Sequence, residues 1–394
     1  MKLSILLSLL PLQAAGLAAT PLTKRTEPAP LLVPRGAQVI PNKYIVKLRS
    51  GGGDFSIADD VLASVGVEPN HRYDRLIKGF SATLSAEELA SLRDHPEVEF
   101  IEQDSMARIA DFVSQANATW GIARLSHRKP HISEYNYDSS AGEGTCAFVV
   151  DTGVKADLAE FEGRAKMLKS FVDGQPDDGH GHGTHVSGTI GSKTYGVAKK
   201  TKIYGVKVLD NEGSGPWSNV IAGLELIKKY VGCGKCPKGL VVNMSLTGYY
   251  SETINQVTKA LVDAGVFVGV AAGNWNDNVA NWSPASEPSV CTVAASDEDD
   301  KMPIWSNWGP LVDVLAPGVN ITSTWRDGSA YLDSGTSMAS PHIVGLAAYI
   351  GALEGIKGGV ICDRIKELAT KDVVTGLRNT NTPNLLGFNG NPSG

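Results

Sequence analysis

The stretch Phe148-Val149-Val150-Asp151-Thr152-Gly153 joins an unbroken apolar run to a carboxylate and a glycine. Apolar runs of this kind recur at four further places: residues 203–209, 240–244, 266–271 and 312–315. Continuous runs indicate strands that are buried on both faces, as in a parallel sheet. Residues 254–264 carry apolar side chains at helical spacing, which predicts a βαβ crossover. We therefore expect an α/β fold with a largely parallel central sheet flanked by helices.

Length and composition limit the function classes. The chain has 394 residues, of which 42% are hydrophobic and 20% charged, so it can build a sizeable core. At roughly 100 to 200 residues per domain, the length predicts two or three folded units. The net charge of −6 provides no basic stripe for phosphates, so the composition argues against nucleic-acid binding.

Residues 1–19 have the pattern of a secretory signal peptide, with Lys2, an apolar stretch over residues 3–12 and then small residues. The alternative, a transmembrane anchor, needs about 18 unbroken apolar residues. Here the run is interrupted by Ser4, Ser8, Pro11 and Gln13. We expect a secreted, extracellular protein without a membrane segment.

Residues 20–110 combine a linker with a small domain. Residues 20–41 are rich in proline, and strands are predicted at Tyr44–Leu48, Phe80–Leu84 and Val98–Ile101. Ser85 and Glu88 form the sequence pattern of a capping box, which predicts a helix start. The pattern is that of a small α+β domain of roughly 65 residues without evident chemistry. The large α/β domain is then expected over residues 111–394.

Three residues have the types that acyl transfer requires. Asp151 ends a buried strand, His182 lies in a glycine-rich turn before a helix, and Ser337 lies in Gly335-Thr336-Ser337-Met338-Ala339-Ser340-Pro341. The hydroxyl of a serine nucleophile needs a base to deprotonate it and a third group to orient the base. We expect Ser337 to stand just before an apolar helix over residues 343–353, with Pro341 tolerated in its first turn.

An amide is the fourth candidate. Asn274 follows the apolar run at 268–271 and can donate to an oxyanion at a strand end. The backbone N–H of Ser337 is the expected second donor, because it stands at a helix N-terminus. The chain order aspartate, histidine, serine is the subtilisin order.

With Asp151-Thr152-Gly153, Gly181-His182-Gly183-Thr184-His185 and the Ser337 motif, the sequence resembles the subtilases, specifically the secreted proteinase K-like group common in fungi. The resemblance covers residues 111–394 and implies a monomeric serine endopeptidase that cuts proteins and peptides without a catalytic cofactor. Residues 44–110 resemble the inhibitory propeptide of that family. The resemblance therefore implies a zymogen whose mature chain starts between Ala110 and Val113.

The resemblance also implies substrate-binding segments. Two of them hold an extended peptide by strand addition, and a third completes a P1 pocket for large apolar side chains. Thr247 stands where relatives usually have glycine, which narrows the pocket rim, and Trp217 stands where proteinase K has tyrosine, over the P4 pocket. The implied residues are Gly213, Ser214, Gly215, Trp217, Ser245, Leu246, Thr247, Gly248, Ala271, Ala272 and Gly273.

A structural calcium ion is implied as well. Its ligands match the Asp313 carboxylate and the carbonyls of Pro288 and Val290. At the family's second, weaker calcium site, Arg128 occupies the position of one ligand.

Five cysteines in a secreted protein predict two disulfides and one remaining thiol. Cys233 and Cys236 also have the spacing of half a zinc site or of a redox dithiol. The resemblance pairs Cys146 with Cys236 and Cys291 with Cys362, and Cys233 could compete for Cys146.

Two other classes of function stay open on the sequence. One is an inactive subtilase-like binding protein, and the other is a metal-dependent hydrolase that uses His180, His182 and His185. Glycosylation sequons stand at Asn117, Asn243, Asn281 and Asn320, but Asn243 falls in a predicted buried strand.

Overall fold

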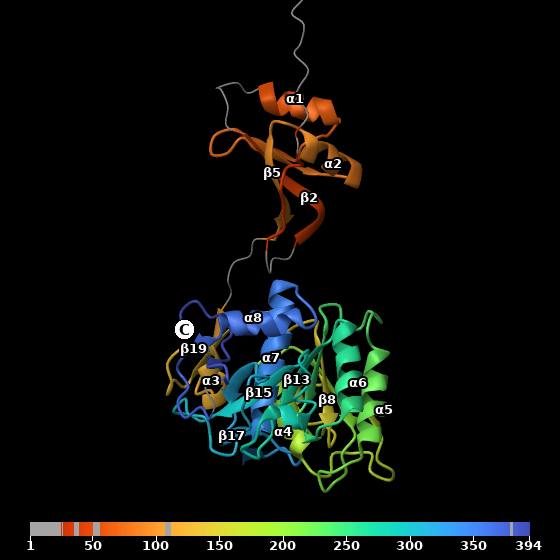
Figure 1. Cartoon of the computed structure of the whole chain (residues 1–394), viewed down its shortest axis with the longest axis vertical. Helices are drawn as coiled ribbons and strands as arrows, with labels where there is room; N and C mark the ends of the chain where they lie inside the picture. The colour runs from red at the N-terminus through yellow and green to blue at the C-terminus, as the bar shows by residue number, and fades with distance from the viewer. Residues whose placement is uncertain (1–24, 26, 35–38, 50–55, 107–111, 379–380) are drawn as a thin grey trace, which may run out of the picture. The chain divides into compact units, whose positions relative to one another are not determined.

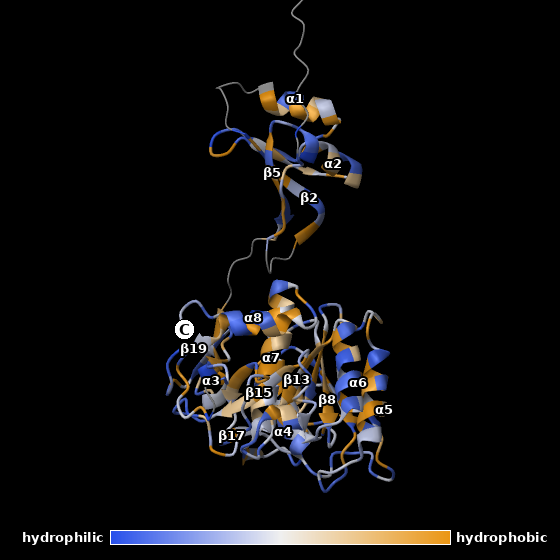
Figure 2. Ribbon diagram, viewed as in Figure 1, coloured by the Kyte–Doolittle hydropathy of each residue, from blue (hydrophilic) through white to orange (hydrophobic). Residues whose placement is uncertain are grey.

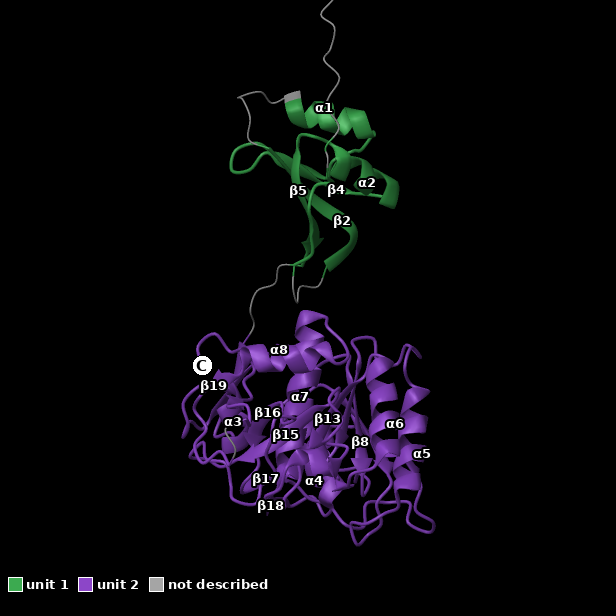
Figure 3. Cartoon of the chain, viewed as in Figure 1, with its two compact units in different colours: residues 1–107 green, residues 108–394 purple. Residues whose placement is uncertain are grey.

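The computed structural model describes residues 25–394 except 26, 35–38, 50–55, 107–111 and 379–380 (Figure 1). The chain divides into two compact units, residues 1–107 and 108–394 (Figure 3). The predicted signal peptide lies outside the described residues, as does the predicted domain border between residues 110 and 111.

The first unit is a sheet with two helices. Helices α1 (Ser56–Val65) and α2 (Ala86–Asp94) share an apolar core with the strands. The capping box predicted at Ser85 and Glu88 is present at the start of α2. The sequence did not predict α1 or β3. In sheet order the strands are β1 (Leu31–Leu32), β5 (Val98–Ser105), β2 (Val39–Leu48), β4 (Gly79–Thr83) and β3 (His71–Tyr73).

The second unit is built on a nine-stranded sheet within the described residues, which confirms the predicted largely parallel sheet. Every neighbouring pair is parallel except the pair of β19 and β20 at one edge. In sheet order the strands are β19 (Thr370–Lys371), β20 (Leu385–Leu386), β16 (Val314–Pro317), β15 (Cys291–Ser296), β13 (Phe267–Ala271), β11 (Leu240–Met244), β8 (Cys146–Asp151), β10 (Lys202–Lys207) and β9 (Ala165–Ser170).

Helices cover both faces of this sheet. Ala147 and Val149 of β8 share one core with α4 (His182–Gly191) and α7 (Thr336–Glu354). Phe148 and Val150 point to the opposite core, which includes apolar residues of α5 (Trp217–Lys228) and α6 (Glu252–Asp263). Helix α7 is largely hydrophobic, whereas α5 and α6 carry hydrophilic stripes (Figure 2). Burial on both faces explains why the strand sequences are continuously apolar.

The remaining elements are short and lie around the sheet. This group contains helices α3 (Trp120–Ser126) and α8 (Val360–Leu368) and two 3-10 turns, η1 (Ala159–Phe161) and η2 (Val279–Asn281). Three antiparallel pairs complete it: β6 (Phe112–Ala116) with β7 (Glu134–Asp138), β12 (Gly248–Tyr249) with β14 (Trp282–Ser283), and β17 (Ile321–Thr324) with β18 (Ala330–Asp333).

Two disulfides tie helices and loops to the sheet. Cys146, the first residue of β8, is bonded to Cys236, and Cys291, the first residue of β15, is bonded to Cys362 in α8. These are the pairs that the resemblance implies. Cys233 keeps a free, exposed thiol. Among the helices that the structure describes, none is long and apolar enough to cross a membrane.

Candidate active site

Asp151 and His182 form a hydrogen-bonded pair at one edge of the sheet. Asp151 is the last residue of β8 and is fully buried, and His182 is the first residue of α4. The distance from His182 Nδ1 to Asp151 Oδ1 is 2.7 Å. Burial lowers the pKa of His182, but the charge of Asp151 and this hydrogen bond outweigh burial, so the pKa lies above its ordinary value of 6.5. The pair fixes the imidazole and leaves Nε2 for a reacting group.

A second buried carboxylate, Asp178, shapes the turn that carries His182. Its Oδ1 accepts hydrogen bonds from Gly181 N–H and from the hydroxyl of Thr152, at 2.8 Å each. Its Oδ2 accepts from both N–H and hydroxyl of Thr184. The turns after β8 and before α4 are thereby locked together. Sequence analysis missed this role, although Asp178 opens the same glycine-rich motif.

Ser337 is the second residue of α7, which begins at Thr336 and not, as predicted, near residue 343. The prediction that Pro341 lies in the first turn is therefore wrong, since Pro341 is the sixth residue of the helix. A proline there removes the N–H that would bond to the carbonyl four residues earlier, which is that of Ser337. That carbonyl accepts instead from Ser245 Oγ at 2.7 Å.

The hydroxyl of Ser337 donates to the carbonyl of Ser245 at 3.3 Å. Among the described side chains, no hydrogen bond joins Ser337 Oγ to His182. Such bonds are often long in a protein without substrate and tighten when the reactant binds. Ser337 and His182 line the same cleft, so the structure brings the predicted nucleophile and base together.

Asn274 lies beside the start of α7. Its Oδ1 accepts from the N–H and from the hydroxyl of Thr336, at 2.9 Å each. Because a backbone N–H can only donate, these bonds fix the orientation of the amide and leave its NH₂ group free to donate. The N–H of Ser337, the second residue of α7, has no acceptor within the helix. This N–H and the NH₂ group of Asn274 can therefore both donate to a reacting group.

A cleft of about 830 Å³ runs past these groups. Of the predicted substrate-binding residues, Ala271, Ala272 and Gly273 are buried and do not line it. The other predicted substrate-binding residues all line the cleft. They are Gly213, Ser214, Gly215, Trp217, Ser245, Leu246, Thr247 and Gly248.

Trp217 and Gly248 connect the two edges of the cleft. A Cβ atom on Gly248 would lie 2.7 Å from the indole of Trp217, closer than any real contact allows. A side chain at position 248 would therefore require the Trp217 ring to shift, so the two lining segments pack closely at this point.

Sequence analysis missed an aromatic stack at the rim. The ring centroid of the buried Trp282 lies 4.1 Å from that of Trp275 and 5.0 Å from that of Tyr249, in both cases stacked. The indole N–H of Trp282 donates to Asp277 at 2.9 Å. Tyr249 and Trp275 line the cleft and are more than half exposed. The position of Trp275 directly after Asn274 was the available signal.

The model of the Subtilase family matches residues 142–369. The chain belongs to the subtilase family. The model of Peptidase inhibitor I9 matches residues 43–110, so this subtilase is a serine protease preceded by an inhibitor domain.

Relatives match over nearly the whole subtilase chain. A "Cuticle-degrading protease" of Metarhizium anisopliae is 49% identical over 391 residues, covering 99% of this chain and 100% of the relative. "Proteinase R" of Parengyodontium album is 46% identical, covering 99% of both chains. The solved structure of a cold adapted subtilisin-like serine proteinase is 39% identical with a TM-score of 0.65, covering 70% of this chain and 99% of that one.

Two further buried histidines of the subtilase unit bond to backbone carbonyls. His185 Nε2 lies 3.0 Å from the carbonyl of Ile321, and His342 Nδ1 lies 2.8 Å from that of Met338. Burial lowers the pKa of both to about 4, so both are neutral near pH 7. His180 lines the cleft with its ring centroid 6.2 Å from that of His182.

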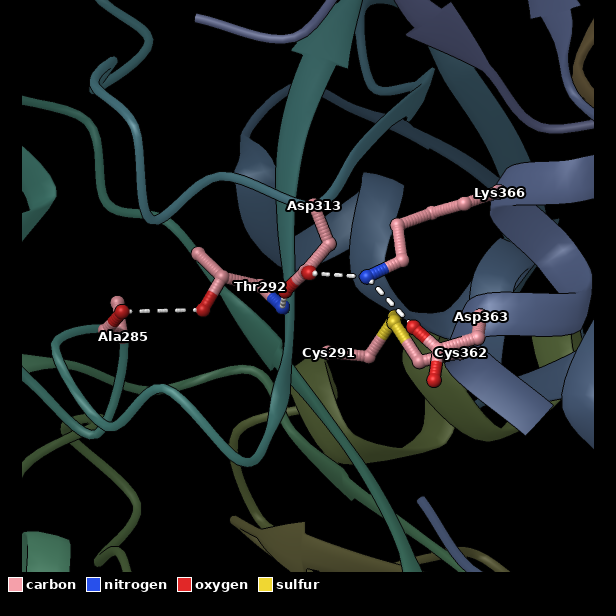
Figure 4. Close-up of a disulfide and its surroundings, with 7 residues drawn as sticks. All are labelled: Ala285, Cys291, Thr292, Asp313, Cys362, Asp363 and Lys366. Carbon is pink, nitrogen blue, oxygen red and sulfur yellow. Dashed lines mark hydrogen bonds and ion pairs between the residues drawn. A yellow bond between two sulfur atoms is a disulfide. The ribbon is translucent and has the colours of Figure 1, made fainter. Parts of the chain in front are cut away.

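The region around Asp313 tests the implied calcium site (Figure 4). Asp313 Oδ2 accepts from the N–H of Thr292 at 2.9 Å, and Oδ1 lies 3.2 Å from the ammonium of Lys366. The sulfurs of Cys291 and Cys362 are close enough to the carboxylate to suggest a metal cluster, but they are bonded to each other. Calcium at Asp313 requires Lys366 to withdraw, so the side chains as placed do not fit this ion.

Proposed function

We propose that this subtilase is a secreted endopeptidase that hydrolyses peptide bonds in proteins through an acyl-enzyme on Ser337. The observation that supports the proposal is the hydrogen bond between His182 Nδ1 and Asp151, because His182 lines the same cleft as Ser337. Broad specificity with a preference for large apolar P1 residues is part of the proposal and is supported by the family resemblance.

In this mechanism Ser337 Oγ attacks the peptide carbonyl carbon while its proton passes to His182 Nε2. Asp151 orients the imidazole and stabilises the imidazolium. The amide NH₂ of Asn274 and the N–H of Ser337 donate to the oxyanion. His182 then gives the proton to the leaving amine as the C–N bond breaks, and water hydrolyses the resulting ester by the same route. The nucleophile, the base, its orienting carboxylate and both oxyanion donors are thus groups of the protein itself.

The inhibitor domain completes the proposal. Residues 1–19 would direct secretion, and residues 20–110 would hold the enzyme inactive until the chain is cut between Ala110 and Val113. The last two residues of that interval, Phe112 and Val113, are part of β6. We propose that the mature protein, residues 111–394, acts as a monomer on protein and peptide substrates.

A fluorophosphonate test addresses this function directly. The purified mature protein is treated with the reagent, and the modified residue is mapped by peptide mass spectrometry. We expect labelling of Ser337 in the folded protein and none after denaturation, because only the folded site activates the hydroxyl. A folded, propeptide-free sample that takes no label would instead favour the inactive binding protein.

The pH profile should follow His182. Only the neutral imidazole accepts the proton of Ser337, so kcat/KM should rise with pH as His182 loses its own proton. Because the pKa of His182 is raised, the midpoint of this acidic limb should lie above 6.5. Rates for a peptide substrate between pH 5 and 9 provide the measurement, and a midpoint below 6.5 would contradict the electrostatics derived for the pair.

Thr247 should restrict large P1 side chains. It lines the cleft, and its buried hydroxyl has no hydrogen-bond partner in the part of the chain that the structure describes. Thr247→Gly removes this bulk, so we expect the ratio of kcat/KM for P1 phenylalanine over P1 alanine to rise about tenfold. Peptides that differ only at P1 measure the ratio, and P4 variants of one peptide serve as the control. An unchanged P1 ratio would remove Thr247 from the specificity site.

A further inference from the structure

Helix α8 is fastened at its start by a disulfide. Cys362 lies in its first turn and is bonded to Cys291 at the beginning of β15 (Figure 4). Asp313 stands immediately before β16, and its carboxylate faces the next turn of the same helix. A strand end and a helix therefore meet at one carboxylate, which is mostly buried with 20% of its side chain exposed.

Lys366 supplies a positive charge to this carboxylate and shares that charge with Asp363, while burial still raises the pKa of Asp313 above its ordinary value. Lys366 Nζ lies 3.2 Å from Asp313 Oδ1 and 2.9 Å from Asp363 Oδ1, and one third of its side chain is exposed. The N–H of Thr292 donates to the other oxygen of Asp313. The ammonium thus bridges one carboxylate on the sheet and one on its own helix, an arrangement that fixes α8 against β15 and β16.

A second side-chain cation lies at the other end of α8. The guanidinium of Arg128 donates to the carbonyl of Leu368 at 3.3 Å, to that of Ala369 at 3.5 Å and to Thr370 Oγ1 at 3.3 Å. It also lies 4.0 Å from the ring centroid of Phe388. The last carbonyls of a helix lack intrahelical donors and carry partial negative charge, so a cation there is stabilising.

We propose that Lys366 serves as the cation of the Asp313 site, so that α8 is held by two side-chain cations and needs no metal ion. Calcium prefers six to eight oxygen ligands at 2.3–2.6 Å. An ammonium in contact with the same carboxylate repels a divalent ion and blocks its approach, so calcium and Lys366 exclude each other. This inference concerns stability and stands independently of the proposed catalytic function.

The experiment compares calcium binding and thermal unfolding of the mature enzyme, inactivated with a fluorophosphonate to prevent self-digestion. Calorimetric titration with calcium should give the same stoichiometry for the wild type and for Asp313→Asn. Lys366→Met should bind one additional calcium ion, because the Asp313 carboxylate is freed, and adding Asp313→Asn to it should abolish that ion.

The melting temperature gives a second readout. In EGTA, Lys366→Met should melt lower than the wild type by about 2–4 °C, and calcium should restore part of the loss. Lys259→Met is the matched control, because Lys259 forms an exposed ion pair with Asp263 on α6 and should change neither value. A wild type that binds one calcium ion more than Asp313→Asn would overturn the proposal, as would a Lys366→Met variant without additional binding.

Discussion

Replacement of Ser337 by alanine should abolish peptide hydrolysis and leave the fold intact. The expected loss in kcat is about a million-fold, the magnitude found when the nucleophile of subtilisin is removed. Among the described residues, the hydroxyl makes one hydrogen bond, a long one to the carbonyl of Ser245, so little stability is lost with it. If the protease removes its own inhibitor domain, the variant should also remain joined to that domain.

The matched control lies on the same helix. Ser340 donates to Asn243 inside the core, so Ser340→Ala should lower the free energy of unfolding by about 1 kcal/mol and keep its activity. Hydrolysis of a chromogenic peptide and thermal unfolding are measured for both variants, with the inhibitor domain supplied as a separate chain. Near-normal turnover by Ser337→Ala would refute the proposed nucleophile.

Asp151→Asn should cost about ten-thousand-fold in kcat, because the base loses its negative partner. The N–H of Thr152 and Nδ1 of His182 both bond to Oδ1, whereas Oδ2 is buried and has no hydrogen-bond partner among the described residues. If the amide oxygen of the variant takes the place of Oδ1, the bonds survive but the charge is gone. In the opposite orientation the amide forces the proton onto Nε2, where it blocks the base.

The pH profile separates this loss from misfolding. Because Asp151 raises the pKa of His182, the residual activity of Asp151→Asn should have its acidic limb at lower pH than the wild type. Asp157→Asn is the control, since Asp157 is exposed and should leave both rate and profile unchanged. A variant within tenfold of the wild-type rate would show that Asp151 has no essential part in the mechanism.

The parts that the sequence predicted are those with local signals. Continuous apolar runs marked β8, β11 and β13 because strands of a parallel sheet are buried on both faces. Strand β15 was missed, since its small residues Cys291-Thr292-Val293-Ala294-Ala295-Ser296 form a weak apolar run. The start of α7 was misplaced because Pro341 was interpreted through local rules, whereas the carbonyl that it leaves free is satisfied by Ser245, in the loop that follows the distant strand β11.

The site was predicted in its residue types but not in its support. Motifs single out Asp151, His182, Asn274 and Ser337. In the fold the last three line one cleft, and Asp151 bonds to His182. The carboxylate of Asp178 that locks the turn, and the ammonium of Lys366 at Asp313, act through contacts between segments far apart in the chain. Such contacts leave no pattern in a single sequence, because any lysine on an exposed helix face looks alike until its neighbour is known.

The order of strands in the sheet has a consequence for the timing of assembly. Strand β20 is second from one edge of the sheet and pairs with β16. It is formed by residues 385–386, whereas β16 is formed by residues 314–317. Sheets that join distant segments form slowly. The sheet therefore cannot be completed until residues 385 and 386 have been synthesised, well after Ser337. Strands β19 and β20, at one edge, are thus the last part of the sheet to be made, after every residue of the candidate site.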